Sequence, residues 1–147
     1  MAGVNFPKDI ATYLDQQISS LRLVSTSTDP TQPNNNLFYN VQMLDNDSLP
    51  SNIVCIYSSR PRRASRSFGA CNEVRYKSAS ILVRGDINAS NENIEDLCEQ
   101  IYDALQSANI GSYKDVVFKY GFEQDRIDEQ NRYIWIAEIE AWYNRTW

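Results

Sequence analysis

The sequence predicts an α+β fold: a mainly antiparallel or mixed sheet of about five strands, with two helices packed on one face. Two segments repeat apolar residues at helical spacing, and five others show the alternation or the β-branched runs that are typical of strands. Along the chain these segments follow the order α-β-β-β-α-β-β. No linker divides the 147 residues, so we expect residues 1–147 to form a single domain.

The first helix is predicted over residues 8–21, with Pro7 at its start, where a missing N–H group costs nothing. Its apolar side chains, spaced four, four and three residues apart, are Ile10, Leu14, Ile18 and Leu21. This spacing places them on one stripe of the helix. The polar, proline-broken segment 25–36 then predicts a long surface loop.

Three strands are predicted between the two helices. Residues 37–44 alternate in hydrophobicity, residues 53–57 form a short β-branched run, and the two strands are joined around residues 48–51. Residues 58–71 interrupt the pattern with Arg and Ser. The pattern resumes as a third strand over residues 74–84.

The second helix is predicted over residues 94–105, with N-capping side chains in residues 88–93 and Gly111 to close its C-terminus. Its apolar positions are Ile94, Leu97, Cys98, Ile101 and Leu105. Its other face carries the acidic residues Glu92, Glu95, Asp96, Glu99 and Asp103. A solvated helix face is the ordinary explanation of these charges, and an acidic rim that faces a partner is the alternative.

Two strands complete the chain, over residues 116–124 and 132–144, with the acidic turn 125–131 between them. The last strand, if extended, spans about 40 Å, the whole width of a domain of this size, so we expect it to be bulged or to project. One face forms a candidate core row of Tyr133, Trp135, Ala137, Ile139, Ala141 and Tyr143. The other face carries Ile134, Ile136, Glu138, Glu140 and Trp142.

The composition argues against catalysis. Histidine is absent, which removes the commonest general base and metal ligand. The acidic turn with Asp125, Asp128 and Glu129 lacks the ligand order of a calcium loop, and the five glycines form no phosphate-binding loop. We therefore expect a protein that is not an enzyme and that binds neither a cofactor nor a metal ion.

Location and redox state follow from what the chain lacks. No apolar run approaches the length of a membrane span, and the N-terminus has no signal-peptide pattern, so we expect a protein made and kept in a cytoplasm. The three cysteines have neither disulfide-framework nor zinc-site spacing, and we expect Cys55 and Cys98 to be buried as small apolar residues. The net charge of −5 argues against nonspecific coating of nucleic acid.

Four arginines, Arg60, Arg62, Arg63 and Arg66, occupy seven consecutive positions of this acidic chain. A solvated loop is the usual explanation of such a run; a nucleic-acid patch and a contact with an acidic protein surface are the alternatives. We favour protein contact, because no aromatic residues interleave the arginines to stack bases. The acceptor could be the acidic second helix of a neighbouring copy.

Trp142 is a further candidate contact residue. It falls on the mixed face of the last strand, near Trp147. One interpretation is a satellite cluster under a loop, and the other is an aromatic anchor in a subunit interface, where Trp and Tyr are enriched. The sequence favours neither.

From residue 53 to the C-terminus the chain resembles the tail terminator, or minor capsid, proteins of long-tailed bacteriophages. The resemblance lies in four strings in this order: Ile-Val-Cys-Ile-Tyr57 before a Pro/Arg loop, Ile-Leu-Val-Arg-Gly85, Glu-Gln-Ile-Tyr-Asp-Ala-Leu105 and Asp-Glu-Gln-Asn-Arg-Tyr133. The predicted N-terminal helix is similar to the family in position only. The basic loop is longer and more basic than the family pattern.

The resemblance implies a virion structural protein at the head-tail junction, assembled in the host cytoplasm. Proteins of this kind form a ring, usually a hexamer, that caps the tail tube, stops its elongation and presents a surface to the head connector or head-closure protein. Residues 60–70 and the turn with Asp128, Glu129 and Arg132 would then contact neighbouring subunits or the tube protein. DNA would only pass through the lumen, which suits an acidic chain.

Other functions remain open from the sequence. A different head-tail connector or head-closure protein shares the size and location but not this element order. A ferredoxin-like module would bind RNA or DNA through its sheet and the arginine loop, and it would show salt-dependent binding. A nuclease using carboxylates and magnesium is a third alternative.

Overall fold

A computed structural model describes residues 5–23, 36–41, 52–61, 66–67, 72–85, 94–127 and 132–146. Within them the elements are α1 (Phe6–Gln17), β1 (Leu37–Tyr39), β2 (Ile53–Ser59), β3 (Arg66–Ser67), β4 (Asn72–Gly85), α2 (Ile94–Leu105), β5 (Lys114–Ile127) and β6 (Tyr133–Thr146). The predicted α+β fold class is confirmed. The two-residue β3 is an addition within a segment where the sequence predicted no strand.

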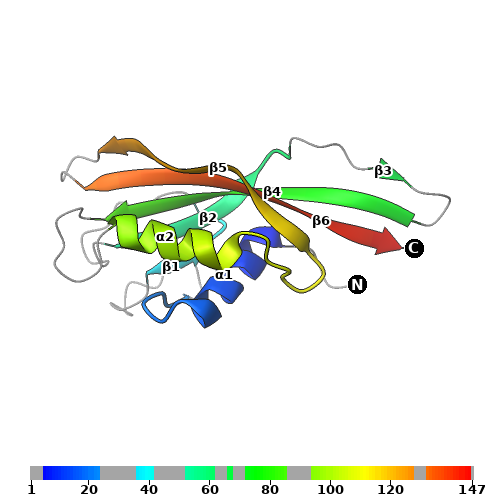
Figure 1. The fold of residues 1–147 in the computed structure, drawn as a ribbon, viewed down its shortest axis with the longest axis horizontal. Helices are drawn as coiled ribbons and strands as arrows, with labels where there is room; N and C mark the ends of the chain where they lie inside the picture. The colour runs from blue at the N-terminus through cyan, green and yellow to red at the C-terminus, as the bar shows by residue number, and fades with distance from the viewer. Residues whose placement is uncertain are drawn as a thin grey trace.

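The strands form one mixed sheet in the order β1-β2-β4-β6-β5 (Figure 1). β1 runs parallel to β2, and the other neighbours are antiparallel. β3 pairs with β4 at Arg66↔Val74 and Ser67↔Glu73, beyond the end of β2. β4 and β6 lie in the centre of this sheet, and β5 is an edge strand.

Both helices cover the same face of the sheet, as predicted. α1 packs against β1, β2 and β4, and α2 packs against β4 and β5. The sheet meets them with alternate apolar side chains, because successive residues of a strand point to opposite faces. The sheet positions buried in this core include Leu37, Val54, Ile56, Ala79, Ile81, Val83, Val116, Ile139, Ala141 and Tyr143.

The opposite face carries a second apolar cluster of Phe38, Ile53, Cys55, Leu82 and Ile134. Arg84 lies between Ile53 and Ile134 in the strand register and is fully buried. Cys55 belongs to this cluster and Cys98 to the helix-side core, so the predicted burial of both is confirmed.

Two element ends differ from the sequence prediction because of local backbone conformation. α1 begins at Phe6, where the Asn5 side chain accepts a hydrogen bond from the Lys8 amide at 3.2 Å. It ends at Gln17, since Ile18 is extended, although Ile18 and Leu21 stay buried. β1 ends at Tyr39, because Asn40 adopts a left-handed φ of 59°. Residues 42–44 of the strand predicted over 37–44 lie outside the described residues.

The predicted closing role of Gly111 for the second helix is wrong. α2 ends at Leu105, and Ser107, with a φ of 63°, reverses the chain while its amide donates to the Val116 carbonyl at 2.8 Å. Gly111 instead takes a φ of 58° in a tight turn, where the backbones of Ile110 and Tyr113 exchange hydrogen bonds.

The last strand, β6, projects as predicted, and the bulges lie in its neighbour β5. β4 and β6, 14 residues each, pair along their whole length, from Asn72↔Thr146 to Gly85↔Tyr133. The irregularities fall in β5, whose pairing with β6 begins only at Lys114↔Trp142. Residues 72–77 of β4 and 141–146 of β6 continue past the core, in which Ala141 and Tyr143 still pack, and β3 pairs with β4 near their end. We name this part the β4–β6 ribbon (Figure 1).

Candidate functional site

The base of the β4–β6 ribbon is held by a chain of aromatic rings. Phe6 packs on Tyr113 with ring centroids 4.8 Å apart, and Tyr113 meets the edge of Tyr143 at 5.6 Å. Burial, followed by the neighbouring Asp9 carboxylate, raises the pKa of Tyr113. These contacts join the start of α1 and the turn before β5 to the first residues of the ribbon, so the ribbon leaves the body in a fixed direction.

Beyond this base β6 has an open backbone edge. Residues 143–146 of β6 pair only with β4 within the described part of the sheet. Outward-pointing N–H and C=O groups on such edges can accept another strand. The ribbon is therefore a candidate surface for contact with another chain.

Three of the sequence-predicted contact residues lie around this end of the sheet: Arg60, Arg66 and Trp142. Arg60 follows β2, is exposed, and its carbonyl accepts a hydrogen bond from the Lys119 ammonium at 2.8 Å. Arg66 opposes Val74 in the ribbon. Arg62 and Arg63 lie outside the described residues.

Trp142, also in the ribbon, is half-buried opposite Tyr76. Its indole N–H donates to the Asp115 carboxylate at 3.4 Å. It joins neither apolar cluster of the described residues. This placement, at the edge of the body and partly exposed, suits a contact residue better than a satellite core.

The structure separates these residues from the predicted turn. Arg132 lies just before β6, ten residues from Trp142, which in an extended strand is about 30 Å. Asp128 and Glu129 lie outside the described residues. The predicted contact residues thus form two groups at opposite ends of β6 rather than one site.

A buried polar network occupies the face opposite the helices, beside the ribbon. The Lys119 ammonium donates to the Glu138 carboxylate at 2.9 Å and lies 3.9 Å from the Glu140 carboxylate. Their side chains are 4%, 20% and 3% exposed, respectively. The hydroxyls of Ser59 and Ser78 lie 2.8 Å apart and continue the network toward Glu138 at 3.4 Å.

The network sets the protonation of its members. Burial alone raises the pKa of Glu138, but hydrogen bonds from Lys119 and Ser59 outweigh it and hold the pKa below its ordinary value. Burial and the neighbouring Glu138 charge raise the pKa of Tyr120. The sequence analysis missed Lys119. The available signal was the pair of glutamates on the same strand face as Ile134 and Ile136, which a buried cation would have to balance.

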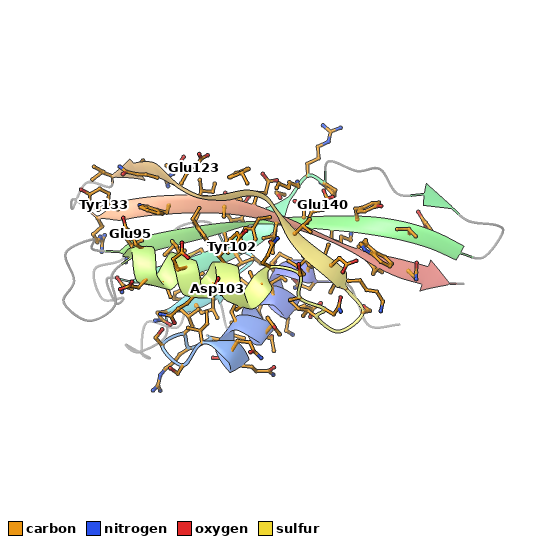
Figure 2. The ribbon with its side chains drawn as sticks, viewed as in Figure 1. Glu95, Tyr102, Asp103, Glu123, Tyr133 and Glu140 are labelled. Carbon is orange, nitrogen blue, oxygen red and sulfur yellow. The ribbon has the colours of Figure 1, made fainter. Side chains whose placement is uncertain are left out.

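A groove of about 420 Å³ lies between α2 and the strands β5 and β6, and we name it the α2 groove. It is lined by Glu95, Cys98, Glu99, Tyr102, Asp103, Gly121, Phe122 and Trp135. Figure 2 shows Tyr102 between α2 and these strands, with Glu123 on the far side of β5. Tyr102 is 36% exposed although it stacks on Phe118 at 4.7 Å.

Two groups in the α2 groove have unusual environments. Burial, with smaller effects of Glu99 and Glu95, raises the pKa of the Cys98 thiol, which is therefore protonated and inert at neutral pH. The Trp135 indole nitrogen is buried and has no hydrogen-bond partner among the described residues. The groove thus combines carboxylates, exposed aromatic surface and an unused donor.

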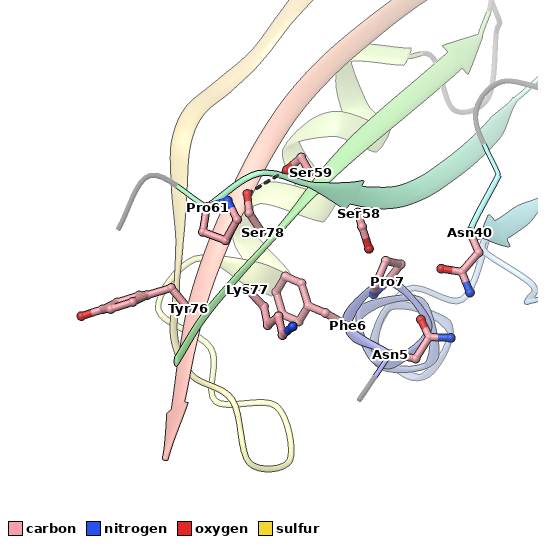
Figure 3. A pocket seen from close by; sticks show the side chains of 10 residues that line it. All are labelled: Asn5, Phe6, Pro7, Asn40, Ser58, Ser59, Pro61, Tyr76, Lys77 and Ser78. Atoms are coloured by element: carbon pink, nitrogen blue, oxygen red, sulfur yellow. Dashed lines mark hydrogen bonds between the residues drawn. The ribbon is translucent and has the colours of Figure 1, made fainter. Parts of the chain in front are cut away.

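A second cavity, of about 340 Å³, lies at the start of α1 (Figure 3). It is lined by Asn5, Phe6 and Pro7 at the start of α1 and by Ser58, Ser59 and Ser78 of the sheet. Lys77 is the one charged residue among those that line it, and Figure 3 shows Tyr76 pointing away. Its lining offers one cation and several neutral polar groups, without a nucleophile-base pair.

Two further site types are absent from the described part of the chain. No group of three His, Cys, Asp or Glu side chains there is placed to hold a metal ion. Neither α1 nor α2 has the length and apolar character of a membrane-spanning helix.

No family model matches the chain, and no curated protein resembles it significantly.

Proposed function

We propose that this chain is a virion structural protein, a tail terminator that forms a ring on the end of a phage tail tube. In this role it stops tube elongation and presents a head-joining surface. The observation that supports the proposal best is the β4–β6 ribbon, which projects from the body with an open edge on β6. The element order and the four family-like strings direct the proposal to this family.

A ring needs a heterologous interface, in which one patch of each subunit fits a different patch of the next. The chain offers two unlike regions for it. The exposed acidic residues of α2 lie on the helix-covered part, whereas β3 and the ribbon lie at the far end of the sheet (Figure 1). Within one copy these regions do not meet, so their contact requires a second copy.

The two regions would contribute differently to assembly. Ion pairs at an exposed rim contribute about 0–1 kcal/mol each and mainly orient the subunits. Backbone pairing along the ribbon edge, with burial of the half-exposed Trp142 and Tyr76, would supply most of the affinity. Such an added strand also covers the edge, which suits a protein whose task is to end a polymer.

The net charge of −5 fits a subunit that surrounds passing DNA, because like charges repel across a water-filled lumen. A nucleic-acid-binding module would instead concentrate cations on the open sheet face. On that face Lys119 is already paired with Glu138, and Arg84 is fully buried.

Light scattering after size exclusion, with and without purified tail tubes, tests the proposal, with negative-stain imaging of the mixture. We expect rings, or tubes capped at one end by this chain. A monomer that ignores tubes but shifts DNA at moderate salt would contradict the proposal and favour a nucleic-acid-binding module. Rings that bind heads and not tubes would favour a connector.

A further inference from the structure

The α2 groove has the chemistry of a receptor for a cationic side chain. Glu95, Glu99 and Asp103 are exposed carboxylates of one helix, and α2 has no basic residue in its last turn to balance them. The opposite wall is aromatic, with Phe122 and Trp135. A side chain that enters between the walls meets negative charge on one side and ring faces on the other.

Two features leave room for an incoming segment. At Gly121 an added Cβ atom would meet no heavy atom within 4 Å, so the strand presents open space beside the groove. Trp135 lines the groove and is only partly buried, so part of its ring is open to an incoming side chain.

Arginine fits this combination better than lysine. Its planar guanidinium stacks on aromatic rings and can bind carboxylates through two parallel hydrogen bonds, whereas an ammonium acts as a point charge.

We propose that the α2 groove binds the arginine-rich segment 60–66 of a second copy of this chain, an inference that rests on the proposed ring. Charge complementarity selects this occupant, because four of the fourteen basic residues lie in that segment. Within one copy the described ends of the segment lie away from the groove. The Arg60 carbonyl is bound by Lys119 on the sheet face opposite the helices, and Arg66 pairs with Val74 in the ribbon.

The direct test is an NMR titration of the full-length, ¹⁵N-labelled chain with a synthetic peptide of residues 58–68. The Trp135 indole resonance, assigned with Trp135→Phe, reports on the groove itself. We expect it to shift saturably as the peptide binds, and we expect no shift from a control peptide in which glutamine replaces the four arginines.

Variants separate the groove from general attraction to an acidic protein. The double variant Glu99→Gln/Asp103→Asn should weaken peptide binding about tenfold, since it removes two charge-assisted partners. Glu123→Gln removes an equally exposed carboxylate from the other side of β5 and should leave the affinity unchanged (Figure 2). Both variants replace exposed side chains, and a thermal unfolding scan verifies their fold.

The outcomes distinguish this inference from the proposed function. If the Trp135 resonance does not shift at millimolar peptide, or if the double variant binds the peptide as tightly as the wild type does, the proposed binding of residues 60–66 in the α2 groove is wrong. This conclusion holds even if wild-type rings cap tubes. Saturable, arginine-dependent binding to a chain that never forms rings would support the groove and contradict the terminator role.

Discussion

The same two strands build two very different regions, the helix-covered body and the β4–β6 ribbon. In the body, β4 places Ala79, Ile81 and Val83 against the helices, and all three are fully buried. In the ribbon, residues 73–77 of β4 are only half-buried, and Asn144 of β6 is exposed. The strand pairing is continuous across both, so the difference lies in what covers the strands. The body contains the apolar core, and the ribbon is the part to which we assign the proposed contacts.

The largest predicted loss of stability comes from a substitution in the body. Ile101→Ala should lower the free energy of unfolding by about 3–4 kcal/mol, because Ile101 is fully buried between α2 and the sheet and truncation leaves a cavity. Val74→Ala in the ribbon should cost about 1 kcal/mol or less. Urea denaturation measures both, and equal losses would contradict this difference between the body and the ribbon.

Lys119→Met should have the next largest effect, about 3 kcal/mol. It leaves the Glu140 carboxylate, 3% exposed, without its nearby cation on the face opposite the helices. Lys8→Met, at an exposed position of α1, is the matched control and should change stability by less than about 0.5 kcal/mol. A Lys119 variant as stable as this control would show that the network makes no net contribution to the free energy of unfolding.

Trp142→Ala should separate folding from assembly. Its half-buried indole makes one long hydrogen bond to Asp115, so we expect a loss of about 1 kcal/mol in unfolding free energy. Ring formation, measured by light scattering, should be lost. Trp142→Phe keeps most of the apolar surface and should retain rings. If Trp142→Ala assembles normally, the ribbon is not the contact surface.

The smallest predicted effect is on the pH dependence of the free energy of unfolding. The pKa of Glu138 is lowered in the folded state, so its contribution to stability is fully present above its unfolded pKa of about 4.3 and is lost as the pH falls through the folded value. Glu138→Gln should therefore flatten the acid limb of the stability curve. Comparing denaturation midpoints at pH 6 and pH 3 checks this, and an unchanged slope in the variant would contradict it.

The sequence predicted the regular elements well because their signals are periodic. Helical spacing located α2 from Ile94 to Leu105, and alternation placed Ala137, Ile139 and Ala141 on the core side of β6. These signals arise from burial, which acts on every turn or every second residue.

The features the sequence did not predict depend on single residues or on distant pairs. The left-handed conformations of Asn40 and Ser107 end a strand and a helix without a glycine to mark them. The burial of Glu140 follows from Lys119, which an intervening bulge in β5 places on the same face. The α2 groove joins residues of α2, β5 and β6, and no sequence spacing relates a helix to two strands of a hairpin.

Hydrogen-deuterium exchange, compared between the free chain and the chain assembled on tail tubes, tests most directly whether the ribbon makes the proposed contacts. Outward-pointing amides in residues 143–146 have no strand partner in the described sheet, so they should exchange fast in the free chain. Assembly should slow them about tenfold or more, while amides of α2 and the centre of β4 stay unchanged. Assembled chains whose ribbon amides exchange as fast as in the free chain would contradict the account.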